Sequence, residues 1–91
     1  YIIGIANKMA QGKIEVRIVS PKGEVFSGDV EHVTLPGVVS SFAVYPRHAA
    51  LISALEEGDI KCSLADGEER KFHIMSGFVE VKDDVVTVCV E

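Results

Sequence analysis

The sequence predicts an all-β fold, an antiparallel β-sandwich of about eight to ten short strands. Apolar residues recur mainly at every second position, and Gly, Pro and Asp interrupt these runs at short intervals. The 91 residues are 47% hydrophobic, which is enough for one modest core. The sequence contains no Trp and few other aromatic residues, so aliphatic side chains must fill this core. We predict one sandwich domain at residues 13–91, preceded by an N-terminal extension at residues 1–12.

The first strand is predicted at residues 14–18, where apolar residues alternate with Glu15 and Arg17. Residues 21–24, Pro-Lys-Gly-Glu, predict a turn because Pro restricts φ and Gly allows positive φ. Residues 25–27 form a short apolar run, and we expect a break or bulge at the following Gly-Asp pair, residues 28–29.

Along the next stretch the apolar positions shift from even to odd residue numbers, since Val30 is followed by Val33 and Leu35. A bulge at residues 31–32 would return them to one face. In the strand expected after it, Phe42 and Val44 share one face of the sheet.

Residues 48–57 give conflicting signals. They are rich in good helix formers and end before Gly58, so local propensity favours a helix. We nevertheless expect residues 51–55 to be extended, because tertiary packing often overrides propensity in a short segment. This choice follows the family resemblance described below.

The second half returns to strand periodicity. Ile60, Cys62 and Leu64 alternate with polar residues, and Asp66-Gly67 is a strong hairpin signal. Further strands are expected around residues 72–74 and 79–81, with a turn at residues 83–84. Residues 85–90 are apolar on both faces apart from Thr87, which is typical of a central or covered strand.

Charge and cysteine usage exclude several classes of function. Residues 1–55 carry five basic and four acidic residues, whereas residues 56–91 carry four basic and ten acidic ones. This balance disfavours nucleic-acid binding, which needs a basic surface. Cys62 and Cys89 lie in apolar runs without Cys-x-x-Cys spacing, so we expect free, at least partly buried thiols in a reducing compartment.

Candidate catalytic groups are sparse. His32 and His73 have no third ligand at a recognisable spacing, although a catalytic metal needs three. No Gly-x-Ser-x-Gly motif or phosphate-binding Gly-rich loop is present. The paired carboxylates Glu68-Glu69 and Asp83-Asp84 point to opposite faces if they lie in strands. We therefore expect a binding protein without catalytic, cofactor-binding or metal-binding residues.

Residues 35–58 carry the most specific pattern. They contain Leu-Pro-Gly, a short loop, Phe-Ala-Val-Tyr-Pro, one residue, His-Ala-Ala-Leu, and then Leu and Gly. This order resembles the signature of the epsilon subunit of F-type ATP synthases. The flanking residues 18–30 and 76–88 extend the resemblance over about residues 13–90.

The resemblance implies a non-catalytic rotor subunit of the central stalk that couples proton flow to ATP synthesis. It would link the gamma subunit to the c-ring, lie peripherally on the cytoplasmic side of a bacterial inner membrane, and be monomeric when isolated. The alternative is a β-sandwich protein-interaction module unrelated to ATP synthase. By resemblance, the gamma-facing residues are Ser20, His48 and Ser53, and the c-ring-facing residues are Gly37, Val38, Val39, Ser40 and Ser41.

Two of these assignments also have alternative interpretations in which the residues serve only the fold. His48 could be a turn residue that packs on its own loop. Val38 and Val39 would expose apolar surface, as interaction sites do, unless one of them folds back under the sandwich.

The sequence departs from the family pattern in several places. Ser40-Ser41 stand where many members have Gly and an acidic residue, and Ala43 and Ala50 replace a Gly and a Pro. The usual C-terminal helical hairpin does not follow Glu91, so we interpret the chain as a short form that binds no ATP. Residues 1–8 are interpreted as added sequence or a mis-assigned start, with Met9 as the natural initiator.

Overall fold

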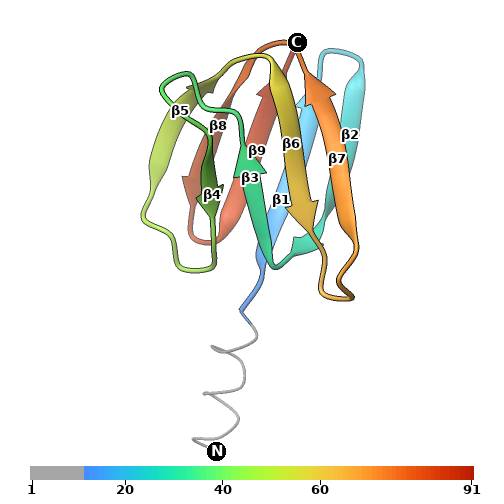
Figure 1. Cartoon of the computed structure of the whole chain (residues 1–91), viewed down its shortest axis with the longest axis vertical. Helices are drawn as coiled ribbons and strands as arrows, with labels where there is room; N and C mark the ends of the chain where they lie inside the picture. The colour runs from blue at the N-terminus through green and yellow to red at the C-terminus, as the bar shows by residue number, and fades with distance from the viewer. Residues whose placement is uncertain (1–11) are drawn as a thin grey trace, which may run out of the picture.

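The computed structural model describes residues 12–91, which form two β-sheets packed face to face (Figure 1). Within this range there is no helix, and the predicted all-β sandwich is confirmed. The predicted N-terminal extension lies outside the described residues except for Gly12. Strands found in residues 12–91 are β1 (Ile14–Ser20), β2 (Gly23–Val30), β3 (His32–Leu35), β4 (Phe42–Val44), β5 (Leu51–Leu55), β6 (Gly58–Ser63), β7 (Glu69–Ile74), β8 (Gly77–Lys82) and β9 (Val85–Val90).

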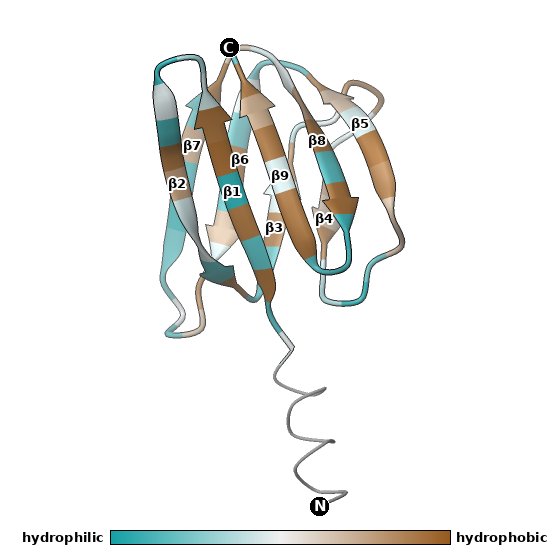
Figure 2. Cartoon of the chain, turned by 180° about the vertical axis from the view of Figure 1, so that it is seen from behind, coloured by the Kyte–Doolittle hydropathy of each residue, from teal (hydrophilic) through white to brown (hydrophobic). Residues whose placement is uncertain are grey.

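The two sheets differ in size and strand order. The five-stranded sheet has the order β2-β1-β9-β8-β5, and the four-stranded sheet has the order β4-β3-β6-β7. Neighbouring strands are antiparallel except for β1 and β9, which are parallel. Figure 2 shows β9 in the middle of the larger sheet, apolar along most of its length. This central place confirms the prediction made from its two apolar faces.

The space between the sheets holds an aliphatic core. Inward side chains follow the two-residue period of each strand, so Ile14, Val16 and Ile18 are fully buried while Glu15 and Arg17 are exposed. No buried polar or charged side chain is found in residues 12–91. The other buried core residues are Val30, Val33, Leu35, Val44, Leu55, Ile60, Cys62, Ile74, Val79, Val81, Val86 and Val88.

The parity change after Val30 has a different cause from the bulge that the sequence suggests. Glu31 is a bend at which the chain leaves the five-stranded sheet and enters the four-stranded one. Val30 and Val33 are both fully buried because they face the same core from opposite sheets. The break or bulge expected at residues 28–29 is also wrong, since β2 continues through Val30. The register shift lies instead between Ile18 and Val19 of β1.

Residues 51–55 form a strand, as predicted against their helix propensity. β5 pairs along its length with β8, and Leu55 is almost completely buried. A helix in this place could not supply the backbone hydrogen bonds that the edge of β8 requires. Tertiary pairing therefore decides the conformation of this segment.

Two hairpin turns agree with the sequence signals. Asp83 and Asp84 form a two-residue turn between β8 and β9, with φ values of 51° and 63°. Positive φ at both positions is typical of a type I′ turn, in which Asp is one of the tolerated residues. The Asp66-Gly67 signal lies in a longer loop between β6 and β7, closed by a 2.8 Å bond from the Leu64 N–H to the Glu68 carbonyl.

Both cysteines are free thiols, as predicted, and they lie in different sheets. Cys62 lies in β6 and is fully buried, and burial raises the pKa of its thiol to about 11. Cys89 lies in β9 and is partly buried. The buried thiol is thus kept protonated and unreactive at neutral pH.

The two thiols should label at different rates. In native protein at neutral pH, a thiol reagent should modify Cys89 faster than Cys62, because Cys62 reacts only when the fold opens. Both should label fully in denaturant without reductant. Absence of labelling in denaturant would mean that the thiols are oxidised, contrary to the structure.

Substitution of Gly77 should destabilise the sandwich. A Cβ at this position would overlap the carbonyl oxygen of Cys89 in the neighbouring strand. We expect Gly77→Ala to lower the free energy of unfolding by about 2 kcal/mol or more, measured by urea denaturation.

Gly28→Ala is the matched control. A Cβ there would meet Phe26 at 3.4 Å, an ordinary contact distance. Its effect on the free energy of unfolding should stay within about 1 kcal/mol. Equal stabilities of the two variants would contradict the packing described at Gly77.

Candidate interaction surface

The histidines and carboxylates of the described residues are not gathered into a metal-binding cluster. No group of three or more His, Cys, Asp or Glu side chains within residues 12–91 is arranged to hold a metal ion. His32 and His73 lie on different strands, β3 and β7, which are separated by β6. This part of the chain also contains no helix suited in length and hydrophobicity to crossing a lipid bilayer.

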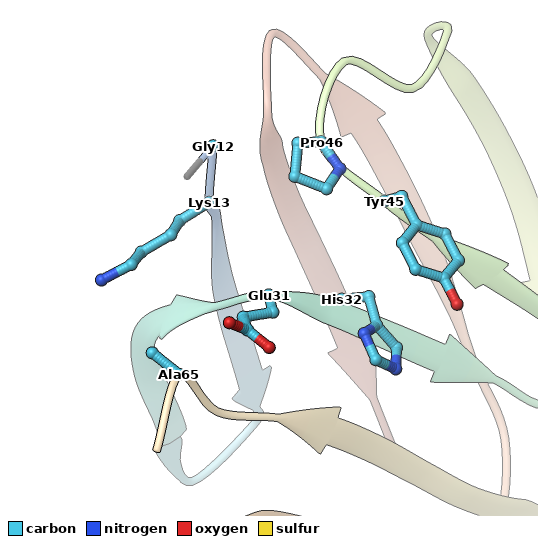
Figure 3. Close-up of a pocket in the computed structure, with 7 residues that line it drawn as sticks. All are labelled: Gly12, Lys13, Glu31, His32, Tyr45, Pro46 and Ala65. Atoms are coloured by element: carbon cyan, nitrogen blue, oxygen red, sulfur yellow. The ribbon is translucent and has the colours of Figure 1, made fainter. Parts of the chain in front are cut away.

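A hollow with a volume of about 550 Å³ lies at the end of the sandwich where β1 begins (Figure 3). His32 and Tyr45 stack on one side of it, with ring centroids 4.7 Å apart. Lys13 and Glu31, of opposite charge, line the other side. The hollow therefore has an aromatic wall and no net charge from these two groups.

The loop between β3 and β4 is attached to the edge of the five-stranded sheet. Gly37 forms a β-bridge with Leu55, and the Val38 N–H donates to the Ala54 carbonyl at 3.1 Å. The Pro36 carbonyl accepts a 2.9 Å bond from the Glu56 N–H. These bonds tie a loop of the smaller sheet to strand β5 of the larger one.

Gly37 is required where this loop begins. A Cβ here would lie 2.5 Å from the Ser40 carbonyl oxygen and 2.9 Å from the Phe42 ring. The residue is buried, and Phe42 is partly buried against the core. The beginning of the loop is therefore closely packed, which restricts how it can move.

The tip of the loop is apolar and exposed. Val38 is 54% exposed and Val39 is 98% exposed, so neither folds back under the sandwich. Ser40 and Ser41 are exposed as well. An almost fully exposed Val next to another exposed Val is typical of an interaction site. We name residues 37–41 the apolar loop.

Exposed apolar residues continue beyond the apolar loop. Phe78 of β8 is 52% exposed and pairs with Ala54, whose carbonyl binds the loop. Ile52 of β5 is 74% exposed. Sequence reasoning missed Phe78, although its signal was present, since the two-residue period places Phe78 opposite the inward Val79.

The residues that the resemblance assigns to a gamma contact do not form one cluster. Ser20 ends β1, where its Oγ donates to the Gly23 carbonyl at 3.1 Å. His48 precedes β5 at the opposite end of the sandwich (Figure 1). Ser53 lies within β5 and is partly buried. The structure thus brings His48 and Ser53 to one edge, whereas Ser20 lies in β1, which is separated from β5 by β9 and β8.

The apolar loop and Ser20 lie at the same end of the molecule. β1, β5 and β9 run in the same direction, and Ser20 and Leu55 are at their carboxyl ends. The apolar loop is bonded to this end of β5. His48 lies partly buried in the loop at the other end, where its Nδ1 donates to the Ala49 carbonyl at 2.8 Å.

His73 bridges two carboxylates on the outer face of the four-stranded sheet. Its Nδ1 is 2.9 Å from Asp59 Oδ1, and its Nε2 is 3.4 Å from Glu57 Oε2. Asp59 and then Glu57 raise the pKa of His73 above its ordinary value by hydrogen bonding to the imidazolium. The site is exposed, so it contributes little to stability.

Comparison with known proteins identifies the family. Residues 13–91 match the family described as ATP synthase, Delta/Epsilon chain, beta-sandwich domain. The chain belongs to this family. Membership confirms the resemblance seen in residues 35–58 and rules out an unrelated β-sandwich module.

Over the aligned residues, curated members of the ATP synthase delta/epsilon family are about two-fifths identical to the chain. It is 42% identical over 78 residues to the ATP synthase epsilon chain of Sulfurovum, covering 86% of this chain and 61% of that one. It is 41% identical over 78 residues to the Nitratiruptor epsilon chain, covering 86% and 60%. The chain therefore spans about three-fifths of the length of these relatives.

Solved structures of ATP synthases share the fold of this family member. A chain of the Euglena gracilis mitochondrial ATP synthase, in an OSCP/F1/c-ring assembly, aligns with a TM-score of 0.81 at 19% identity. That alignment covers 86% of this chain and 50% of the other. A chain from the Tetrahymena thermophila central stalk/c-ring aligns with a TM-score of 0.71 at 22% identity, covering 88% and 64%.

Removing either carboxylate partner of His73 should lower the pKa of its imidazole. We expect Asp59→Asn to lower this pKa more than Glu57→Gln, because Asp59 makes the larger contribution. NMR titration of the imidazole protons measures the change. Glu69→Gln, on the same strand, is the control and should leave the pKa unchanged.

The sign of the accompanying stability change follows from linkage. The pKa of His73 is higher in the folded state, so its stabilising contribution is present below about pH 6.5 and is lost as the pH rises through the folded value. Asp59→Asn should therefore reduce stability slightly at low pH and not at high pH. An unchanged pKa in Asp59→Asn would contradict the geometry.

Proposed function

We propose that the chain acts as the β-sandwich part of an ATP synthase epsilon chain, a non-catalytic rotor element that links the gamma subunit to the c-ring. Family membership supports the choice of complex. The observation that carries the proposed contact is the exposed Val38–Val39 tip on a loop attached to β5. In this role the chain transmits the proton-driven rotation of the ring to the catalytic head through its contact surfaces. No residue of the chain forms or breaks a covalent bond.

The apolar loop fits a contact with the c-ring. Its tip offers the apolar side chains of Val38 and Val39 and the hydroxyl groups of Ser40 and Ser41. Its attachment to β5 would pass a lateral force into the larger sheet. The Tetrahymena structure carries the description central stalk/c-ring, which supports the same assignment here by analogy.

The gamma contact is assigned to the edge of the sandwich that carries His48 and Ser53, with Ser20 as a separate contact at the far end of β1. A stable interface of this kind buries on the order of 1,200 Å² or more. One edge strand alone is too small for that, so the exposed Ile52 and Phe78 would extend the contact across the outer face. Apolar side chains in the centre of such a contact supply most of its affinity.

The proposed location follows from the complex. The curated relatives are bacterial epsilon chains. We therefore assign the chain to the cytoplasmic side of the inner membrane, beneath the catalytic head. The chain would be held there peripherally, through gamma and the c-ring. When isolated it would be monomeric.

Charge at the tip of the apolar loop should uncouple the motor without unfolding the chain. We expect the double substitution Val38→Asp with Val39→Asp to reduce ATP synthesis in vesicles that contain the reconstituted complex. Both side chains are exposed, so the melting temperature should stay within about 4 °C of the parent's. Binding to the gamma subunit should persist.

Val25→Asp is the control for this experiment. Val25 is 48% exposed on β2, at the opposite edge of the five-stranded sheet from β5. It should leave ATP synthesis unchanged. Normal synthesis with the double variant would place the c-ring contact elsewhere, and loss of gamma binding would show that the apolar loop faces gamma.

A further inference from the structure

The loop that carries His48 contains a backbone conformation that its own sequence does not favour. Arg47, immediately before His48, has φ of 64°, in the left-handed region. Only Gly enters this region without steric cost, and Arg has no special tendency to do so. Because local preference disfavours this conformation, contacts from the rest of the fold must hold it.

Asp84 supplies such a contact. The Arg47 N–H donates to Asp84 Oδ1 at 2.6 Å, across 37 residues of sequence. A hydrogen bond to a carboxylate is stronger than one between neutral groups. Asp84 is partly buried, whereas Arg47 is exposed, so the acceptor is the better fixed of the two partners.

Asp84 is itself held by two other elements. It is the second residue of the two-residue turn between β8 and β9. Its carbonyl accepts a 2.9 Å bond from the Glu15 N–H in β1. One residue thus joins the β4–β5 loop to three strands of the five-stranded sheet, β1, β8 and β9.

We propose that Asp84 is the positioning residue of the β4–β5 loop, holding Arg47 and His48 in the conformation that meets the partner subunit. The part of this inference that concerns the partner rests on the proposed gamma contact. Asp84 touches no partner in this role and acts through the Arg47 amide. The neighbouring Asp83 is exposed, and its side chain makes no hydrogen bond within residues 12–91, so the two turn residues have different roles.

Glycine substitutions distinguish the loss of the carboxylate acceptor from disruption of the turn. Asp83 and Asp84 both have positive φ, so Gly at either position suits the backbone and should preserve the hairpin. Asp84→Gly removes the carboxylate acceptor, and Asp83→Gly is the matched control that keeps it. Asp84→Asn retains an oxygen acceptor and should restore the wild-type behaviour.

The first measurement is amide hydrogen exchange at Arg47 in the isolated chain. Asp84→Gly should accelerate exchange by about tenfold or more relative to Asp83→Gly, with core amides of β9 unchanged. Asp84→Asn should stay within about threefold of the wild type. Equal exchange in the two Gly variants, or failure of Asn to restore protection, would overturn the positioning role.

The second measurement is affinity for the gamma subunit of the same complex. Asp84→Gly should raise the dissociation constant by about tenfold, while Asp83→Gly and Asp84→Asn should remain near the wild type. If Arg47 exchange changes and gamma affinity does not, the loop is not part of the gamma contact and the inference fails for the partner. Failure of the wild-type chain to bind gamma would instead refute the proposed function, and amide exchange alone would then decide whether Asp84 holds the loop.

Discussion

Burial of one aliphatic layer between two sheets is the constraint on which the rest of this structure depends. Within residues 12–91 no buried side chain is polar or charged, so the layer is held by strand parity and by backbone pairing. Each strand must present its apolar residues inward, and this requirement sets where the chain turns. The bend at Glu31 is the clearest consequence, since the chain changes sheets there and Val30 and Val33 both reach the core.

The loops that carry the proposed contacts are held by bonds between the two sheets. The apolar loop leaves the four-stranded sheet and bonds to β5 of the five-stranded one. The loop with His48 runs from β4 to β5 and is bonded to the turn between β8 and β9. The proposed rotor role requires force to be transmitted without deformation, and loops bonded to the opposite sheet suit that task better than loops held only at their ends.

Much of the fold and part of the candidate site could be predicted from the sequence. Alternation placed Ile14, Val16 and Ile18 in the core, and the apolar run at residues 85–90 indicated a central strand. Val38 and Val39 are exposed, which agrees with the interpretation that two Val residues in a loop after Pro-Gly lie at the surface. These inferences succeeded because strand period and turn chemistry act over a few neighbouring residues.

Other features depend on residues that are distant in sequence. Residues 48–57 favour a helix locally, and extended structure at Leu51–Leu55 follows from pairing with β8. Ser20, His48 and Ser53 were grouped by resemblance, but strand order places Ser20 away from the other two. No local pattern indicates that Asp84 binds the Arg47 amide.

The sequence by itself determined which residues face the core and where turns can form, because side-chain periodicity and the φ preferences of Gly, Pro and Asp are local properties. Only the tertiary structure decided that Glu31 is a change of sheet and that β1 lies parallel to β9. The same holds for the attachment of the apolar loop to β5. These features depend on which strands become neighbours, and that is settled by burying all the apolar faces together.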